Sequence, residues 1–319
     1  MDDVKTLSLV GGVLALLLGA TTIGQWLKKQ PDIGLNPALI EAFNLRIRAW
    51  WLMCTVLAAA FLLGPASRVA TVVLFGLISF WALREFITLT PTRLGDHRTL
   101  FWVFIVFTPL QYVLVGMGEE YSGLLFSVLI PVYAFLFIPT RVALAGDFKR
   151  FLERTAKIQA GLIICVYCLS YAPALLGLDI PNFKGQNPRL LFFFVLLVQL
   201  SDVLQYAWGK LFGKHLVAPA ISPSRTWEGF FGGVASATLI GTALWWATPF
   251  EFWQAAAISL AVSVMGFAGG LTMSAIKRDR GVKDYGTLVV GHSGVLDRID
   301  SICFAAPVFY HLTHFFTTG

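Results

Sequence analysis

Charged residues are scarce in this sequence. Lys, Arg, Asp and Glu together make up 13% of its 319 residues, whereas 57% of the residues are hydrophobic. Soluble domains carry about 25% charged residues, so the composition excludes an ordinary soluble domain and indicates a membrane protein. Internal repeats and low-complexity segments are absent too, which excludes a repeat array.

Cysteine is also rare. The four cysteines all lie in apolar runs: Cys54, Cys165, Cys168 and Cys303. The Cys165-x-x-Cys168 spacing is typical of metal or redox sites, but no second pair and no polar neighbours accompany it. Because free cysteine is a common small buried residue, we interpret all four as packing residues.

Long apolar runs fill most of the chain. A helix needs about 20 apolar residues to cross a bilayer. Ten runs approach that length: residues 7–27, 48–64, 69–83, 99–117, 122–139, 158–177, 190–208, 229–247, 253–275 and 299–316. The run 69–83 is short and gives the weakest signal. The sequence therefore predicts an all-α, polytopic integral membrane protein with about ten transmembrane helices and no room for a soluble domain.

The distribution of basic residues predicts the orientation of these helices. With the N-terminus outside, the loops that would face the cytoplasm hold all of the 24 Lys and Arg residues except Lys5, Arg68, Lys184 and Arg189. Because cytoplasmic loops are enriched in Lys and Arg, we expect the N-terminus to lie outside. The net charge of +6 then reflects topology and anionic lipid headgroups, and it does not indicate a nucleic-acid partner.

One polar stretch stands between the last two apolar runs. Residues 274–301 hold four carboxylates and five Lys or Arg residues in 28 positions. Asp297 and Asp300 are spaced i, i+3, so on a helix they share one face and can hold one cation. Positive charge for a polyphosphate comes from Lys277, Arg278, Arg280 and Lys283. The glycines that let the backbone bend around a ligand are Gly281, Gly286, Gly291 and Gly294.

This combination has two interpretations. Carboxylates for a hard metal ion beside cations for phosphates are typical of phosphoryl or nucleotidyl transfer. The alternative is a cytoplasmic loop that is basic only to fix topology. The paired aspartates and the spaced glycines favour the functional interpretation.

The same stretch resembles the signature of the phosphatidate cytidylyltransferases (CDP-diacylglycerol synthases). That signature reads Ser-x-apolar-Lys-Arg, four residues, Lys-Asp-x-Gly, a short gap, and His-Gly-Gly-apolar-x-Asp-Arg-apolar-Asp. The matching residues are Ser274, Ile276, Lys277, Arg278, Lys283, Asp284, Gly286, His292, Gly294, Val295, Asp297, Arg298, Ile299 and Asp300. The sequence departs at Ser293, where the family has Gly, and at Val290, where Pro or Gly usually stands. So many polar identities at fixed spacing make the resemblance specific.

A second block precedes the first and also resembles this family, whose pattern is Asp-x3-Tyr-x2-Gly, Gly-Lys, then Ser-Pro-Lys-Lys-Thr-Trp-Glu-Gly. The corresponding residues are Asp202, Tyr206, Gly209, Lys210 and the run 222–229. Ser224 and Arg225 stand where the family often has two basic residues, and Val203, Leu204 and Gln205 replace small residues. The resemblance covers about residues 190–310 and implies a divergent member of the family.

The residues of the second block also support a role by themselves. A carboxylate in or near a membrane helix is costly, so Asp202 is a functional candidate, and Tyr206 shares its helix face. The alternative for Asp202 is a structural hydrogen bond between helices. Ser222 and Thr226 offer hydroxyls, and Arg225 can bind a phosphate with both arms of its guanidinium. The alternative for this run is an amphipathic loop that leads into the next helix.

The resemblance implies a reaction and roles for these residues. It implies transfer of CMP from CTP to phosphatidic acid, which gives CDP-diacylglycerol and pyrophosphate. The candidate catalytic residues are Asp284, Asp297, Asp300, Lys277, Lys283 and His292. The candidate Mg²⁺ ligands are Asp202, Asp284, Asp297 and Asp300. The candidate substrate-binding residues are Arg278, Arg298, Lys210, Lys214, Ser222, Arg225, Thr226 and Tyr206.

Two other functions stay open at this point. A CTP-dependent lipid-alcohol kinase would need related residues, and a membrane transporter would also carry buried carboxylates. We expect residues 1–185 to form N-terminal transmembrane helices and residues 186–319 to form the catalytic region. We further expect membrane lipids as surroundings, a bacterial inner (plasma) membrane location and an active site that faces the cytoplasm. The family's members suggest a homodimer.

Overall fold

The computed structural model describes most of the chain from residue 67 onward. The described ranges are 67–89, 92–118, 124–181, 183–282, 284–285 and 294–318, together with residues 11–12, 14, 18–19, 21–22, 25–26 and 51. The chain divides into two compact units, Met1–Thr71 and Val72–Gly319. All the predicted site residues belong to the second unit. The predicted division at residue 186 stays a prediction.

Among the described residues, six helical segments are long and apolar enough to cross a membrane: Ser67–Thr88, Leu94–Met117, Leu125–Ala143, Phe151–Gly177, Asn187–Phe212 and Phe252–Asp279. They agree with six of the ten expected runs and support a helical membrane protein. The first, α3 (Ser67–Thr88), extends beyond the short run 69–83 because its polar end is stabilised: Arg84 stacks on Trp81, 5.1 Å from the ring centroid, and Glu85 is hydrogen-bonded.

Several of these segments are built from consecutive helical pieces. Leu94–Met117 comprises η3 (Leu94–Asp96), α4 (His97–Trp102), the π-helical η4 (Val103–Phe107) and α5 (Thr108–Met117). Leu125–Ala143 comprises α7 (Leu125–Val128), η5 (Leu129–Ala134) and α8 (Phe135–Ala143). Phe151–Gly177 comprises α9 (Phe151–Leu162), η6 (Ile163–Cys168), α10 (Leu169–Ala174) and η7 (Leu175–Gly177).

The C-terminal half consists of four long helices and a hairpin. These elements are α11 (Asn187–Phe212), β1 (Leu216–Ala218), β2 (Ser222–Thr226), α12 (Trp227–Ala243), η8 (Trp245–Ala247), α13 (Phe252–Asp279) and α14 (Leu296–Thr318). α12 has 17 residues, and neither α12 nor α14 is among the six candidate spans found in the described residues. The runs 7–27 and 48–64 lie largely outside the described residues, and ten spans stay a prediction.

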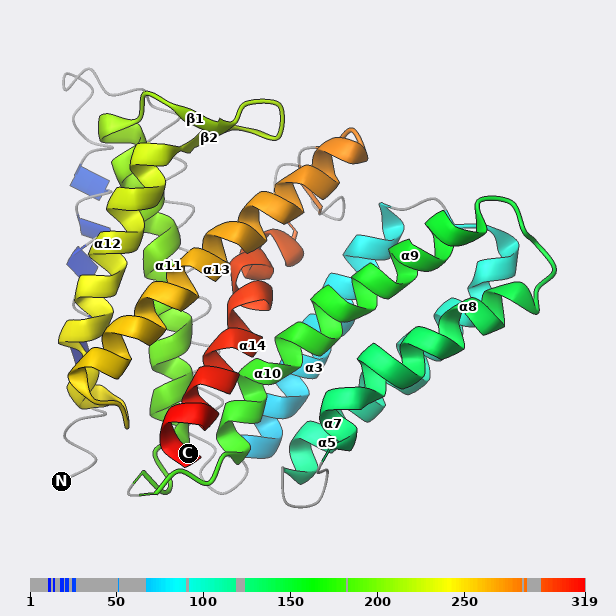
Figure 1. The fold of residues 1–319 in the computed structure, drawn as a ribbon, viewed down its shortest axis with the longest axis horizontal. Coiled ribbons are helices and arrows are strands. Elements are labelled where there is room, and N and C mark those ends of the chain that lie inside the picture. Colours follow the sequence, from blue (N-terminus) through cyan, green and yellow to red (C-terminus); the bar gives the residue numbers. More distant parts are fainter. Residues whose placement is uncertain are drawn as a thin grey trace. The chain divides into compact units, whose positions relative to one another are not determined.

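The four long helices pack closely through small residues. α11 and α12 lie side by side, and α13 crosses them before α14 returns along it (Figure 1). At Gly233 of α12 an added Cβ would come within 2.5 Å of the Cα atom of Gln205 on α11. At Gly269 of α13 it would come within 2.8 Å of the main-chain oxygen of Asp300 on α14. Glycine is required at both crossings because no side chain fits between the helices.

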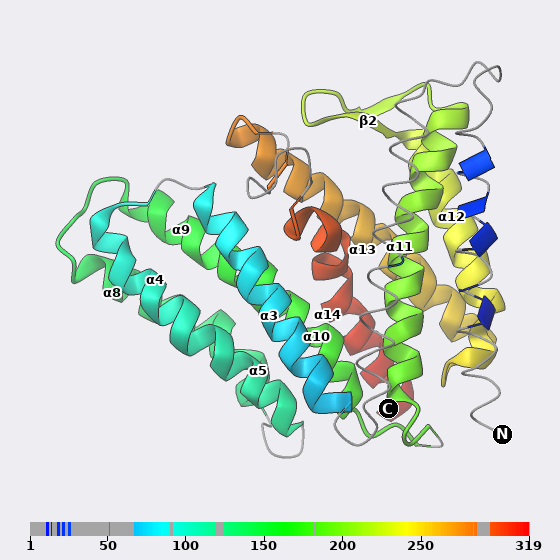
Figure 2. The same cartoon turned by 180° about the vertical axis from the view of Figure 1, so that it is seen from behind.

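The N-terminal part of the second unit packs through α3 and α9, which run side by side (Figure 2). An added Cβ at Gly161 of α9 would lie 2.7 Å from the ring of Phe86 on α3. Leu83 and Phe86 are buried there, with 0% and 3% exposure. The end of α3 that carries Glu85 is therefore fixed in the core.

A short β-hairpin stands between α11 and α12. β1 and β2 pair antiparallel, with Leu216 opposite Thr226 and Ala218 opposite Ser222. Glu228 on α12 holds the entry to the hairpin, because its carboxylate accepts the backbone amides of Lys214 and His215 and contacts the His215 ring. These hydrogen bonds, the His215 side chain first, lower the pKa of Glu228 to about 2.

Candidate active site

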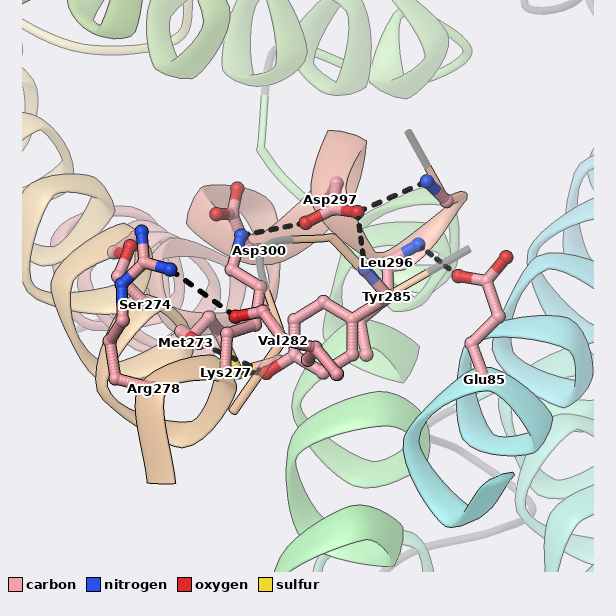
Figure 3. A network of polar contacts seen from close by, with 12 residues as sticks. Glu85, Met273, Ser274, Lys277, Arg278, Val282, Tyr285, Leu296, Asp297 and Asp300 are labelled. Atoms are coloured by element: carbon pink, nitrogen blue, oxygen red, sulfur yellow. Dashed lines mark hydrogen bonds and ion pairs between the residues drawn. The ribbon is translucent and has the colours of Figure 1, made fainter. Parts of the chain in front are cut away.

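The predicted site lies where the C-terminal end of α13 meets the N-terminal end of α14 (Figure 3). α13 ends at Asp279, and Gly281 then takes a positive φ of 71°. The amide of Val282 donates to the carbonyl oxygen of Lys277 at 3.0 Å. The amide of Gly281 donates to that of Arg278, also at 3.0 Å. This pair of bonds is a glycine C-cap, so Gly281, which was expected to bend around a ligand, ends a helix.

An ion pair joins the two helix ends. Lys277 Nζ donates to Asp297 Oδ1 at 2.7 Å, and the two side chains are 15% and 7% exposed. Asp297 Oδ2 accepts the backbone amides of Tyr285, at 2.8 Å, and Gly294, at 3.0 Å. Both carboxylate oxygens are therefore engaged by the protein. Asp297 fixes two points of the connecting segment against the start of α14.

Tyr285 is a buried residue of this segment, and the sequence analysis did not single it out. It is 1% exposed, and its hydroxyl donates to the main-chain oxygen of Met273 at 3.0 Å. Burial raises the pKa of Tyr285, so the phenol is neutral. Lys277 Nζ lies 5.4 Å from the ring centroid, where the negative face of the ring attracts the cation. Lys277 is thus held by a carboxylate and by a ring.

Asp300 lies one turn after Asp297 on α14 and has different neighbours. Its Oδ1 accepts the amide of Ser301 at 2.8 Å. No residue in the described part of the chain donates to its Oδ2. The main-chain oxygen of Asp300 packs against Gly269 of α13, the neighbour of Gly270, where the Arg225 guanidinium lies. Asp300 therefore keeps one carboxylate oxygen available for a ligand.

Arg225 reaches this place from the hairpin. Its guanidinium lies 5.1 Å from the ring centroid of Phe267 on α13, and its Nη1 donates to the main-chain oxygen of Phe267 at 3.3 Å. An added Cβ at Gly270 would lie only 2.1 Å from Arg225 Nη2. The bare backbone of Gly270 therefore makes the space that the guanidinium occupies.

Arg278 and Thr226 have structural partners. Arg278 is exposed, and its guanidinium donates to the main-chain oxygens of Ile221 at 3.1 Å and Val282 at 3.3 Å, which ties the hairpin turn to the end of α13. Thr226 is 8% exposed, and its Oγ1 accepts the amide of Gly229 at 3.1 Å. This is the N-cap of α12.

The remaining predicted residues are spread around this cluster. Asp202 and Tyr206 on α11 and Arg298 on α14 are half-buried. Ser222 is buried, whereas Lys210, Lys214 and Asp284 are exposed. Lys210 Nζ lies 5.8 Å from the ring centroid of Tyr206. No ion pair joins Lys210, Lys214 or Asp284 to another residue in the described part of the chain. Lys283 and His292 lie outside the described residues, as do the departures at Val290 and Ser293.

The departure at Val203–Gln205 has a structural role. Gln205 is 8% exposed, and its Nε2 donates to Ser201 Oγ at 2.8 Å on the same helix. The residue also fills the crossing with Gly233 of α12. The buried amide is therefore paired within the α11–α12 interface.

Glu85 is a site neighbour that the sequence analysis missed. It comes from α3, and its carboxylate accepts the amide of Leu296 at 2.8 Å (Figure 3). It also accepts the amide of Val295 at 3.0 Å. The available signal was a carboxylate two residues beyond the apolar run 69–83, because carboxylates in or near a membrane helix are costly. Its partner is 211 residues away in the sequence, so no local pattern indicates it.

The fit of Mg²⁺ can be judged from these donors. The described residues include no group of three or more His, Cys, Asp and Glu side chains placed to hold a metal ion. Mg²⁺ does not need such a cage, because it keeps several waters and binds through one or two carboxylates and the phosphates of its nucleotide. Asp300 fits such a site. Asp297 fits it less well, since both of its oxygens already accept protein hydrogen bonds.

Comparison with known proteins gives a family match and several relatives. The chain matches the cytidylyltransferase family over residues 44–316. It is 40% identical over 309 residues to "Uncharacterized protein YnbB" of Escherichia coli K12, covering 95% of this chain and 96% of that protein. Phosphatidate cytidylyltransferases of Staphylococcus epidermidis and Staphylococcus aureus are 37% and 38% identical over 127 residues. These alignments cover 39% of this chain and 49% of each enzyme, so the chain matches about half the length of those relatives.

Proposed function

The chain belongs to the cytidylyltransferase family, and we propose that it transfers CMP from CTP to phosphatidic acid, giving CDP-diacylglycerol and pyrophosphate. The family and the apolar helices support CTP-dependent nucleotidyl transfer by an integral membrane enzyme. The names of the Staphylococcus relatives favour phosphatidic acid as the acceptor. The structural observation that carries the proposal is the Lys277–Asp297 ion pair where α13 joins α14, with the Arg225 guanidinium at Gly270 and the main chain of Asp300 at the neighbouring Gly269.

Electrostatics sets the barrier of this reaction. A phosphate oxygen of phosphatidic acid is already anionic, so it needs no strong general base to attack the α-phosphorus of CTP. The difficulty lies in bringing two anions together and in stabilising the charge on the transferring phosphoryl group and on the leaving pyrophosphate. Positioning and fixed positive charge therefore contribute most, as in phosphoryl transfer generally.

The residues take roles that follow from their contacts. Lys277 is fixed by Asp297 and the Tyr285 ring, so in our proposal its charge is aimed before the substrates arrive. Arg225 packs against α13 at Gly270, which has no side chain to block it. There its guanidinium can bind a phosphate. The other proposed phosphate-binding residues are Arg278, Arg298, Lys210, Lys214 and Lys283. Proposed contacts of the substrates are also Ser222, Thr226, Tyr206 and His292.

Mg²⁺ would be held by Asp300 through Oδ2, with Asp202 and Asp284 as the other proposed ligands. Bound there with the nucleotide, the ion would supply positive charge against the phosphates of CTP. Asp297 contributes in this proposal by orienting Lys277.

We also propose the membrane arrangement that the basic residues predict: about ten spans, the N-terminus outside and the active site facing the cytoplasm of a bacterial inner membrane. Nucleotides are available on that side. The homodimer and the division into residues 1–185 and 186–319 belong to this proposal.

The reaction is tested with purified protein in detergent, Mg²⁺, phosphatidic acid and CTP labelled at its α-phosphate. We expect the label to enter the lipid phase with release of pyrophosphate. The matched control is Asp300→Asn, which removes the open carboxylate oxygen.

A second labelled nucleotide separates this reaction from the kinase. With CTP labelled at its γ-phosphate and a diacylglycerol acceptor, a kinase would place the label in the lipid, whereas a cytidylyltransferase finds no phosphate acceptor and leaves the label in CTP. Transfer of the γ-label to lipid without transfer of the α-label would overturn the proposal.

A further inference from the structure

Glu85 is a carboxylate in a membrane-spanning helix that binds the start of another helix. It is 5% exposed on α3, and its two oxygens each accept one main-chain amide of α14, Val295 at 3.0 Å and Leu296 at 2.8 Å. The indole of Trp81 also donates to Glu85 Oε1, at 3.2 Å. Every one of these donors is neutral.

The first amides of a helix have no partner within the helix, and its N-terminus carries a partial positive charge. A carboxylate from another helix can accept these amides and compensate the partial positive charge. α14 uses two such groups: Glu85 binds the amides of Val295 and Leu296, and Asp297 binds that of Gly294. The three consecutive amides are thus held by one carboxylate from α3 and one from α14 itself.

The position of Glu85 is itself fixed. Its neighbours Leu83 and Phe86 are buried, and Phe86 contacts Gly161 of α9 so closely that no Cβ would fit. Leu296 precedes Asp297 directly, and Asp300 follows one turn later. An anchor on Leu296 therefore sets the direction in which both aspartates leave the helix.

We propose that Glu85 is a positioning residue, which holds the N-terminus of α14 so that Asp297 orients Lys277 and Asp300 faces the substrates. This inference rests on the function proposed above. Glu85 itself touches neither substrate. A positional error of about 1 Å is enough to reduce turnover strongly, so loss of this anchor acts on kcat more than on binding.

Glu251 provides a matched control. It stands at the start of α13, where its main-chain amide donates to Gln254 Oε1 at 2.9 Å and its carboxylate accepts the indole of Trp253 at 2.7 Å, as Glu85 accepts that of Trp81. It lies at the end of α13 opposite Lys277. Glu251→Ala therefore removes a carboxylate from the start of another helix without disturbing the start of α14.

The experiment compares Glu85→Ala, Glu85→Gln and Glu251→Ala in the purified full-length protein. We expect Glu85→Ala to lower kcat by about tenfold with KM for CTP within about twofold, because the contacts with nucleotide remain. Glu85→Gln keeps one acceptor oxygen and should restore part of the loss. Hydrogen exchange measured by mass spectrometry should become faster at residues 294–296 in Glu85→Ala and stay unchanged in Glu251→Ala.

The exchange measurement does not depend on catalysis. If the wild-type protein transfers no CMP, the proposed function fails, and faster exchange at residues 294–296 still supports the anchor. Unchanged exchange in Glu85→Ala overturns it. An equal loss of kcat in Glu251→Ala also overturns it, since that result would reflect the loss of any carboxylate at the start of a helix. Where Glu85→Ala does not fold, Glu85→Gln with the same two measurements decides.

Discussion

At the scale of residues, Asp297 and Asp300 lie one turn apart on α14 but meet different partners. Both oxygens of Asp297 accept hydrogen bonds, from Lys277 and from two backbone amides, whereas no described residue donates to Asp300 Oδ2. The i, i+3 spacing alone makes the two carboxylates equivalent, and only their neighbours separate a structural carboxylate from a candidate ligand. Neutralising Asp297 should therefore affect stability as well as turnover, whereas neutralising Asp300 should affect mainly turnover.

We expect Asp300→Asn and Asp297→Asn each to reduce turnover at least about a hundredfold, on the order of 3 kcal/mol. Asp297→Asn should also lower the free energy of unfolding by about 3 kcal/mol, because it leaves the mostly buried Lys277 unpaired. Turnover and Tm in detergent measure the two effects. The control is Asp279→Asn, whose carboxylate is 66% exposed. Equal Tm values for the two variants would contradict the distinction.

Gly270 offers a test of Arg225 that changes no charge. Gly270→Ala places a methyl group 2.1 Å from the present position of Arg225 Nη2, so the flexible guanidinium has to move. Alanine is a better helix former by about 1 kcal/mol, so Tm should not fall. We expect kcat/KM for CTP to drop by about tenfold.

Gly266→Ala is the matched control for this substitution. It lies one turn earlier on α13, and its added Cβ would meet only ordinary contacts, at 3.6 Å to Ser301 and 3.8 Å to Val198. Activity retained in Gly270→Ala would mean that the position of the Arg225 guanidinium does not matter for the reaction.

At the scale of elements, the hairpin is the part that the sequence did not reveal. Its strands have three and five residues, and prolines at positions 219 and 223 obscure any alternating pattern. The hairpin is fixed from both sides, by Glu228 and Thr226 at α12 and by Arg278 at α13. It thereby delivers Arg225 to the site.

Substitutions at Thr226 test whether the hydroxyls of the run 222–229 have a structural or a substrate-binding role. Thr226→Ala removes the N-cap of α12 and should cost about 1 kcal/mol of stability, while Thr226→Ser keeps the cap. We expect Tm to fall in the first variant only, with KM for CTP unchanged in both. A raised KM with an unchanged Tm in Thr226→Ala would instead support the predicted substrate contact.

At the scale of the whole molecule, the sequence predicts the class and the polar cluster but not how distant parts meet. Apolar runs predict where most helices lie because length and hydropathy are local properties. The motif likewise contains Lys277 and Asp297. It does not predict that they pair, since their 20-residue separation includes a turn whose path local rules leave open. The anchor from Glu85 spans 211 residues and depends on tertiary packing alone.

The orientation of the chain in the membrane is tested with two exposed positions. Asp279 follows the predicted cytoplasmic end of α13, and its side chain is 66% exposed. Lys184 lies between two predicted spans on the opposite side, and its side chain is 78% exposed. Cys165 and Cys303 are buried, so they add little background labelling by a thiol reagent.

Because cytoplasmic loops carry most basic residues, a membrane-impermeant thiol reagent applied to intact cells should label Lys184→Cys and spare Asp279→Cys. Opening the membrane should make Asp279→Cys react. The reverse pattern in intact cells would place the site outside the cytoplasm, where CTP is not supplied, and would remove the basis for the proposed reaction.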